Sequence, residues 1–176
     1  MSEYADGSAG GAERSDVSTS VHATALVIGE AGVLVRGPSG SGKSALALAL
    51  LALADDRKLF ARLIGDDRVS ISVENRRILA RGAPNIHGLI ERRGYGIVEM
   101  PTEPCAIVRL VVDLLPDHQP GARLPDEDTR RAFLAGMPAP RLMFDGGSSP
   151  LERAYAVLGY LDKTGDKIMT GFAHFA

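Results

Sequence analysis

The sequence predicts an α/β fold in which helices flank a mixed sheet. Beyond the first twenty residues, short extended runs alternate with turns, and only a few stretches have helical periodicity. A long apolar run at 106–115 is typical of a buried strand, and the apolar run at 45–54 directly follows a glycine-rich turn. Because 45% of the 176 residues are hydrophobic, the chain is long enough and apolar enough to form one domain with its own core.

The extended runs predict two β-hairpins and a central strand. The hairpins are 24–28 with 32–36 around Gly29-Glu30-Ala31, and 69–73 with 77–80 around Glu74-Asn75. The central strand is 106–115, in which only Arg109 and Asp113 interrupt the apolar run. Helices are expected at 45–54 and, after Pro150, at 151–161. A mobile loop is expected at 116–128, which is rich in Pro, Gly and Asp.

The composition indicates where the folded domain begins and in which cellular compartment the protein is expected. Residues 1–20 are rich in Gly, Ala and Ser and lack the hydrophobic stretch of a secretory signal, so we assign 1–20 to a flexible tail and 21–176 to the domain. The longest unbroken apolar run has ten residues, fewer than the roughly 20 that cross a membrane. The single cysteine, Cys105, permits no internal disulfide and is expected to be a buried small side chain. We predict a cytoplasmic protein without a membrane partner.

The net charge of −2 gives the chain no overall basic character, so nucleic-acid partners are disfavoured, although a local basic patch stays open as an alternative. The chemical information lies instead in a glycine-rich segment that matches the phosphate-binding pattern G-x-x-x-x-G-K-[ST]. Its residues are Gly37, Pro38, Ser39, Gly40, Ser41, Gly42, Lys43 and Ser44. Four fixed positions would coincide in a chain of this length about once in a hundred, so an accidental Gly/Ser-rich turn is the weaker interpretation.

The phosphate loop, as we call residues 37–44, lies between an extended run and a helical run. In that setting backbone N–H groups converge on the phosphates of a nucleotide. Lys43 is expected to lie along the β- and γ-phosphates, and the Ser44 hydroxyl to complete the shell of a Mg²⁺ ion.

Two acidic residues, Asp66 and Asp67, follow the apolar stretch that ends at Gly65. In phosphate-loop proteins an acid at the end of a neighbouring strand meets the metal or its bound water. Adjacent strand residues point to opposite faces, so one acid is expected to bind metal while the other takes a proton. A solvated turn is the alternative for an isolated Asp-Asp pair.

A further cluster, 87–96, compresses charged residues and glycines into ten positions. Glu91 is a candidate metal ligand there, and Arg93 a candidate for stabilising charge on a transferred phosphoryl group. A solvated strip of salt bridges is the alternative interpretation.

Taken together, these segments resemble the catalytic domain of the HPr kinase/phosphorylase family from His22 to about Leu115. His22 lies fifteen residues before the phosphate loop, and the loop, the Asp66-Asp67-Arg68-Val69 strand end and the stretch at 91–97 follow in the family's order. Arg123-Leu124 is the one short stretch that we align after Leu115. The resemblance implies a fold similar to the HPr kinase catalytic domain, in a form without the family's extra N-terminal domain.

The resemblance implies an enzyme that uses ATP and Mg²⁺ to phosphorylate a serine of HPr, the phosphocarrier protein of the sugar phosphotransferase system. It also implies a homo-oligomer, commonly a hexamer, and a reverse phosphorolysis. Carried over by position, Lys43 binds phosphates, Ser44 and Glu91 hold metal, and Asp67 exchanges the proton. His22 and Arg123 assist, whereas the resemblance does not separate the role of Asp66 from that of Asp67.

Two other functions stay open at this point. A small-molecule kinase shares the phosphate loop, and a non-catalytic nucleotide sensor would bind ATP without turnover. A guanine-nucleotide switch is disfavoured because the sequence has no Asn-Lys-x-Asp motif. The residues at 145–150 occupy the place of a Pro- and Arg-containing loop that the family uses in dephosphorylation, so the reverse reaction is also left open.

Overall fold

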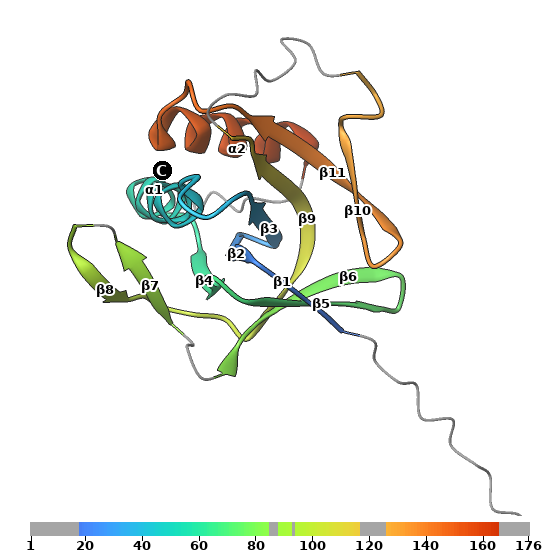
Figure 1. Cartoon of the computed structure of the whole chain (residues 1–176), viewed down its shortest axis with the longest axis horizontal. Helices are drawn as coiled ribbons and strands as arrows, with labels where there is room; N and C mark the ends of the chain where they lie inside the picture. Colours follow the sequence, from blue (N-terminus) through green and yellow to red (C-terminus); the bar gives the residue numbers. More distant parts are fainter. Residues whose placement is uncertain (1–17, 85–87, 93, 117–125, 166–176) are drawn as a thin grey trace, which may run out of the picture.

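The computed structural model describes residues 18–84, 88–92, 94–116 and 126–165. Figure 1 shows a curled sheet with two helices on one side of it. The strands are β1 (Thr19–Val21), β2 (Ala23–Ile28), β3 (Ala31–Arg36), β4 (Ala61–Gly65), β5 (Val69–Glu74), β6 (Arg77–Gly82), β7 (Leu89–Arg92), β8 (Gly96–Glu99), β9 (Cys105–Leu114), β10 (Arg131–Leu134) and β11 (Met137–Phe144). The helices are α1 (Lys43–Asp56) and α2 (Pro150–Thr164).

The main sheet is mixed, as the sequence predicts. Its strands run in the order β1-β5-β6-β9-β3-β2-β4, and β11 with its partner β10 branches from β9. The pairs β3–β9 and β9–β11 are parallel, and the other pairs in this sheet are antiparallel. Strand β9 is central because its first residues pair with β6 and its later residues pair with both β3 and β11.

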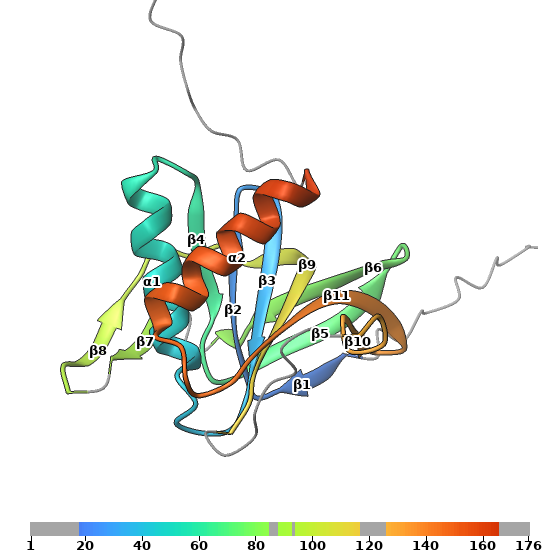
Figure 2. The ribbon, with the colours of Figure 1, turned by 90° about the horizontal axis from the view of Figure 1, so that it is seen from above.

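Two hydrophobic cores lie on the two faces of this sheet. On one face, α1 and α2 lie side by side and bury residues such as Leu46, Leu50 and Leu158 against the sheet (Figure 2). On the other face, the sheet curls around a second core that includes Leu34, Ile71 and Val111. The alternation of side chains along β3 and β9 explains this division, since neighbouring residues of one strand enter different cores.

The predicted hairpins, the central strand and both helices are present, with small shifts at their ends. The turn between β5 and β6 is formed by Asn75 and Arg76, which both have positive φ, so Glu74 belongs to the strand rather than to the turn. Helix α1 begins at Lys43 and ends at Asp56, and α2 extends from Pro150 to Thr164. The α/β class with a mixed sheet is confirmed.

Three parts of the sequence prediction differ from the structure. Cys105 is exposed rather than buried, because it begins β9 at the end where that strand pairs only with β6. Thr19 and Ser20, which the sequence assigned to the tail, pair with β5 as part of β1. Most of the predicted tail and of the loop at 116–128 lies outside the described residues.

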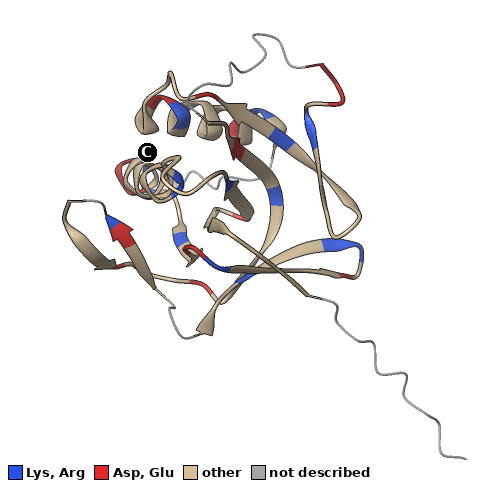
Figure 3. Cartoon of the chain, viewed as in Figure 1, with Lys and Arg blue, Asp and Glu red and all other residues tan. Residues whose placement is uncertain are grey.

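Two hairpins had no counterpart in the prediction. One is β10–β11, whose strand β11 contains Pro138 and Pro140, residues that normally argue against a strand. The other is β7–β8, a separate two-stranded sheet beside α1 (Figure 1). Both described helices carry acidic and basic residues (Figure 3), and neither is long and apolar enough to cross a membrane.

Candidate phosphate-transfer site

The phosphate loop connects the end of β3 to the start of α1, at one end of the parallel strands. Gly42 caps α1 with a φ of 94°, a conformation that L side chains rarely adopt. At Gly37 a Cβ would lie 2.6 Å from Ser41 Oγ and 2.7 Å from the Leu114 carbonyl oxygen. Glycine at both positions therefore lets the backbone fold tightly around the space in front of the helix.

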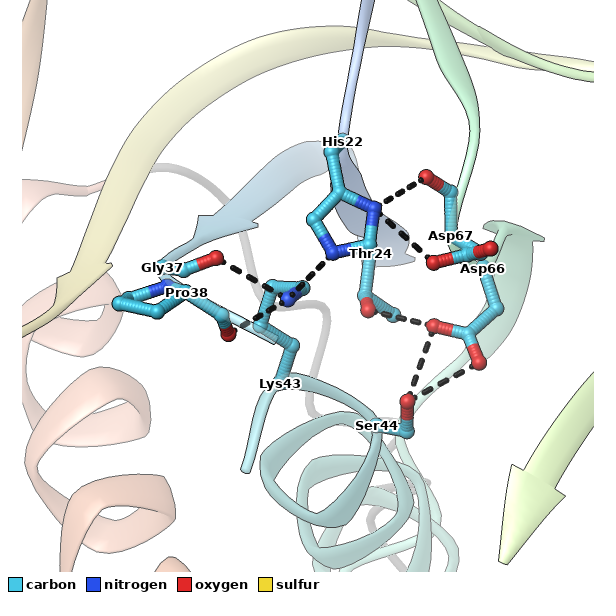
Figure 4. Close-up of polar contacts among 8 residues, drawn as sticks. All are labelled: His22, Thr24, Gly37, Pro38, Lys43, Ser44, Asp66 and Asp67. Carbon is cyan, nitrogen blue, oxygen red and sulfur yellow. Dashed lines mark hydrogen bonds and ion pairs between the residues drawn. The ribbon is translucent and has the colours of Figure 1, made fainter. Parts of the chain in front are cut away.

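Lys43 is folded back over this loop (Figure 4). Its Nζ donates to the carbonyl oxygens of Gly37 and Pro38, each at 3.0 Å, and lies 3.0 Å from His22 Nε2. Burial lowers the pKa of Lys43 from its ordinary value, and the nearby carboxylates of Asp67 and Asp66 act in the opposite direction. The cation is thus held where a phosphate would be its strongest partner.

His22 links Lys43 to Asp67. A lysine ammonium only donates hydrogen bonds, so His22 Nε2 is the acceptor and the ring proton is on Nδ1. Nδ1 then donates to the Asp67 carboxylate, 2.9 Å from Oδ1, and lies 3.0 Å from the Asp67 carbonyl oxygen. The imidazole therefore orients the carboxylate of Asp67 relative to the phosphate loop.

Asp67 lies in a strained and open turn. Its φ is 67°, and the N–H of Arg68 donates to the carbonyl oxygen of Asp66 across it, which describes a γ-turn. Such backbone conformations cost on the order of 1–3 kcal/mol and persist where the surroundings impose them. The Asp67 side chain is 75% exposed, so an incoming group can reach it.

Asp66 has different surroundings from its neighbour. It is 7% exposed and accepts hydrogen bonds from Ser44 Oγ at 3.1 and 3.0 Å and from the hydroxyl of buried Thr24. The two acids consequently face different partners, as expected, but the reason differs from the expectation: both follow the end of β4 and lie in a turn, so strand alternation does not separate them. Asp66 is directed at the start of α1, whereas Asp67 is directed at His22 (Figure 4).

The oxygen atoms of Asp66 and Ser44 are hard donors of the kind that Mg²⁺ prefers. Among the described residues there is no cluster of three or more His, Cys, Asp or Glu side chains that could hold a metal by itself. A Mg²⁺ ion bound through one or two protein groups together with substrate phosphates and water fits this sparse set of donors.

Glu91 is the one predicted site residue within the described ranges that the structure does not bring into this cluster. Glu91 is exposed on β7, and within the described ranges no hydrogen bond or ion pair joins it to Ser44 or Asp66. Arg93 and Arg123 lie outside the described residues. The roles of these three residues stay predictions.

Three residues of the site were missed by sequence reasoning. Thr24 lies two positions after His22, and that spacing on an extended segment was its only signal. Asp113, noted only as an interruption of β9, accepts two hydrogen bonds from Arg36 at 2.7 and 2.8 Å and so ties β9 to the residue before the loop. Arg153 of α2 reaches the carbonyl oxygen of Ser41.

The sequence is similar to that of proteins known as HPr kinase/phosphorylase. It is 41% identical to the one from Geobacillus sp. strain WCH70 over 86 aligned residues, and this alignment covers 48% of this chain and 26% of the relative. It is 39% identical to the one from Enterococcus faecalis over 101 aligned residues, and this alignment covers 57% of this chain and 29% of the relative. The chain thus matches less than a third of the length of these relatives.

The fold is similar to that of a solved structure, the Hpr(Ser) kinase/phosphatase from Coxiella burnetii. The likeness has a TM-score of 0.68 and 26% sequence identity, and it covers 83% of this chain and 98% of the other. The family model of the HPr Serine kinase C-terminal domain matches residues 14–103, just over half of the chain, including the phosphate loop and both acids. This chain therefore belongs to the family of the HPr serine kinase C-terminal domain.

Proposed function

We propose that this protein is an ATP- and Mg²⁺-dependent kinase that phosphorylates a serine of HPr. The observation that carries this proposal is a connected set of contacts in a chain of this family. Lys43 and Ser44 of the phosphate loop contact His22 and Asp66, respectively, and His22 in turn contacts Asp67. Phosphoryl transfer requires mainly positioning and electrostatic stabilisation, and these residues supply both.

In the proposed reaction, the Asp67 carboxylate accepts the proton of the serine hydroxyl. The serine oxygen forms a bond to the γ-phosphorus of ATP while the bond to the β–γ bridging oxygen breaks, and ADP leaves with that electron pair. Lys43 and the loop N–H groups hold the phosphates during the transfer. His22 keeps the Asp67 carboxylate facing the reaction through the hydrogen bond from Nδ1.

Ser44 and Asp66 are the residues that would hold Mg²⁺, which when bound neutralises charge on the phosphates. The contacts between Ser44 Oγ and both carboxylate oxygens of Asp66 support this pairing. We therefore assign Asp66 to the metal and Asp67 to the proton.

A protein acceptor fits this site better than a metabolite. The Asp67 side chain is mostly exposed, so a serine on the surface of another protein has access to it. A small-molecule kinase needs an enclosed acceptor pocket. One cavity of the described residues lies between β10–β11 and α2, where Arg130, Pro138 and Tyr160 contribute to its lining, and none of its lining residues belongs to the phosphate-transfer site.

The test is incubation of the purified chain with Mg-ATP and HPr, followed by intact-mass measurement. We expect one added phosphate on HPr, and none when the target serine of HPr is replaced by alanine. Phosphate transfer to metabolites but not to HPr would favour the small-molecule kinase. ATP binding without any transfer would favour the nucleotide sensor.

We also infer a homo-oligomer from the family resemblance. The exposed apolar side chains of Tyr95 and Ile97 on the β7–β8 hairpin are consistent with a contact between copies. Light scattering coupled to size-exclusion chromatography measures the mass, and a monomer at micromolar concentration would exclude a stable assembly.

A further inference from the structure

Arg153 is a buried cation at the edge of the phosphate loop. It lies in the first turns of α2, and only 6% of its surface is exposed. Its Nη1 lies 3.4 Å from the carbonyl oxygen of Ser41, and a Cβ built on Gly42 would lie 3.7 Å from the same nitrogen. A residue 112 positions from Ser41 in sequence thus reaches the part of the loop that directly precedes Lys43.

The partners of this guanidinium are neutral. Nε donates to Ser148 Oγ at 3.1 Å, and Nη2 donates to the backbone carbonyl of Asp145 at 2.7 Å. Together with the bond to Ser41, these contacts use three of its N–H groups. A guanidinium carries about five N–H groups, so donor capacity remains. Within the described part of the chain, no carboxylate forms an ion pair with Arg153.

Two physical arguments indicate that this arrangement is incomplete. A buried charge is costly unless an opposite charge is placed beside it. In addition, a cation near the N-terminus of a helix meets the positive end of the helix dipole, so its position in α2 is unfavourable by itself. The fold therefore tolerates Arg153 at a place where an anion would relieve both costs.

The loop itself contains a second unsatisfied group. Among the described residues, Ser41 Oγ is a buried hydroxyl without a hydrogen-bond partner. Ser41 is also the residue whose carbonyl oxygen contacts Arg153. A phosphate group in the loop would offer acceptor oxygens to the hydroxyl and to the guanidinium alike.

We propose that Arg153 is a phosphate-binding residue, and that α2 thereby contributes a second cation to the loop in addition to Lys43. The ligand class is a polyphosphate, either that of a nucleotide or inorganic pyrophosphate. The inference rests on the proposed function only in requiring that the loop binds phosphates, and it is independent of which acceptor is phosphorylated.

The test compares Arg153→Met with the parent chain. Met has a similar length but no charge, so we expect the dissociation constants of Mg-ATP and of Mg-pyrophosphate to rise about 10- to 100-fold by titration calorimetry. The ligand-free melting temperature should stay within a few degrees of the parent or rise, because an uncompensated buried charge has been removed. Arg153→Lys should recover part of the affinity.

A purely structural role predicts the reverse pattern. If Arg153 only tethers α2 to the loop, Arg153→Met lowers the ligand-free melting temperature and leaves both dissociation constants unchanged, which would overturn the proposal. Lys163→Met is the matched control, since it removes one charge from the exposed far end of the same helix. It should change neither quantity.

A structure of the parent chain with Mg²⁺ and a non-hydrolysable ATP analogue decides the matter even if Arg153→Met does not fold. A guanidinium nitrogen about 3 Å from a phosphate oxygen supports the proposal, and a guanidinium that remains on the carbonyl oxygens of Ser41 and Asp145 alone overturns it. A parent chain that binds Mg-ATP but does not phosphorylate HPr would reject the proposed kinase and leave the proposal for Arg153 standing.

Discussion

The phosphate loop and the β7–β8 hairpin both carry residues that the family resemblance assigns to one site. Among the described residues, however, only those around the loop contact one another. Around the loop, buried Thr24 and Asp66 form a hydrogen-bonded cluster with Ser44. On the hairpin, Ile90 is buried against α1 and the sheet, whereas Glu91 and Tyr95 are exposed.

The difference follows from how each region is supported. The loop is held between two core strands and a helix whose apolar residues are buried on the sheet, so its geometry is set by the packing. Among the described residues, the two strands of the hairpin pair only with each other, and one face of the hairpin is left to solvent. We infer that the core half of the site is preorganised, and that the hairpin contributes only when a ligand or a partner draws Glu91 toward it.

The largest effect on catalysis is expected at Asp67, the proposed base in the preorganised half of the site. Asp67→Asn should lower kcat for HPr phosphorylation about 10²- to 10⁴-fold while the dissociation constant of Mg-ATP changes little, because the amide accepts no proton. Asparagine also tolerates the positive φ at this position, so the fold should be kept. Radiolabel transfer and titration calorimetry measure the two quantities.

Asp162→Asn on the exposed side of α2 is the control for the loss of one charge. Transfer at the parent rate by Asp67→Asn would remove the assignment of Asp67 as the base.

The next effect concerns nucleotide binding. Lys43→Ala should abolish the thermal stabilisation by Mg-ATP, which for the parent at 100 times its dissociation constant is about 2.7 kcal/mol. Lys58→Ala, just after the C-terminal end of α1, should retain it. An undiminished shift in melting temperature for Lys43→Ala would contradict the loop as the phosphate site.

The affinity should also depend on pH in a defined direction. Burial lowers the pKa of Lys43, whereas Asp67 and Asp66 raise it. As pH rises through the Lys43 pKa the ammonium is lost, so Mg-ATP binding weakens on the alkaline side at a pH below the ordinary 10.5 of lysine. Because Asp67→Asn removes a carboxylate that raises this pKa, its alkaline limit should lie lower than that of the parent.

Sequence reasoning predicted the parts of the site that are contiguous or follow a family order. The loop from Gly37 to Ser44 could be found because its pattern needs only a strand before it and a helix after it. The bond from Thr24 to Asp66 joins residues 42 positions apart, and it depends on how β2 pairs with β4. Strand pairing of this kind is set by the whole fold, so no local pattern predicted it.

The fold shows the same limit. Periodicity predicted β9 and both helices because long apolar runs must be buried. It missed β10–β11, because Pro138 and Pro140 argue against a strand in the sequence. In the structure both prolines lie opposite residues of β10 in an antiparallel pair. It also placed Cys105 inside, because no local pattern shows that the start of β9 pairs only with β6.

A substitution of Glu91 in the β7–β8 hairpin should have a smaller effect, which concerns only the magnesium dependence of phosphorylation. If Glu91 joins the metal only in the ligand-bound state, Glu91→Gln should raise the Mg²⁺ concentration for half-maximal phosphorylation about tenfold, as the loss of one weak ligand does. The affinity for ATP without Mg²⁺ should not change. A magnesium titration of the transfer rate measures this.

Glu99→Gln provides the matched control, because it removes the same charge from the other strand of the same hairpin. If both variants have the magnesium dependence of the parent, the hairpin does not supply a metal ligand and the site is confined to the core half.

The smallest effect is expected at the N-terminal cap of α2, because Ser149 and Glu152 bond to each other and no hydrogen bond of the described residues joins their side chains to the phosphate loop. Ser149 caps this helix and accepts from the N–H of Glu152, whose carboxylate accepts in turn from the N–H of Ser149. Ser149→Ala should lower the free energy of unfolding by about 1 kcal/mol, with kcat unchanged. Urea unfolding monitored by circular dichroism measures the difference.

The same cap makes the stability of the fold depend on pH, whereas kcat at neutral pH should not depend on the cap. The hydrogen bond from the N–H of Ser149 holds the pKa of Glu152 below its ordinary value, so the ionised form stabilises the fold above that value. This stabilisation is lost as pH falls through the lowered pKa, and Glu152→Gln should remove that part of the acid sensitivity. A fall in kcat at neutral pH in either cap variant would show that the start of α2, which also carries Arg153, is coupled to the phosphate loop more tightly than the packing alone requires.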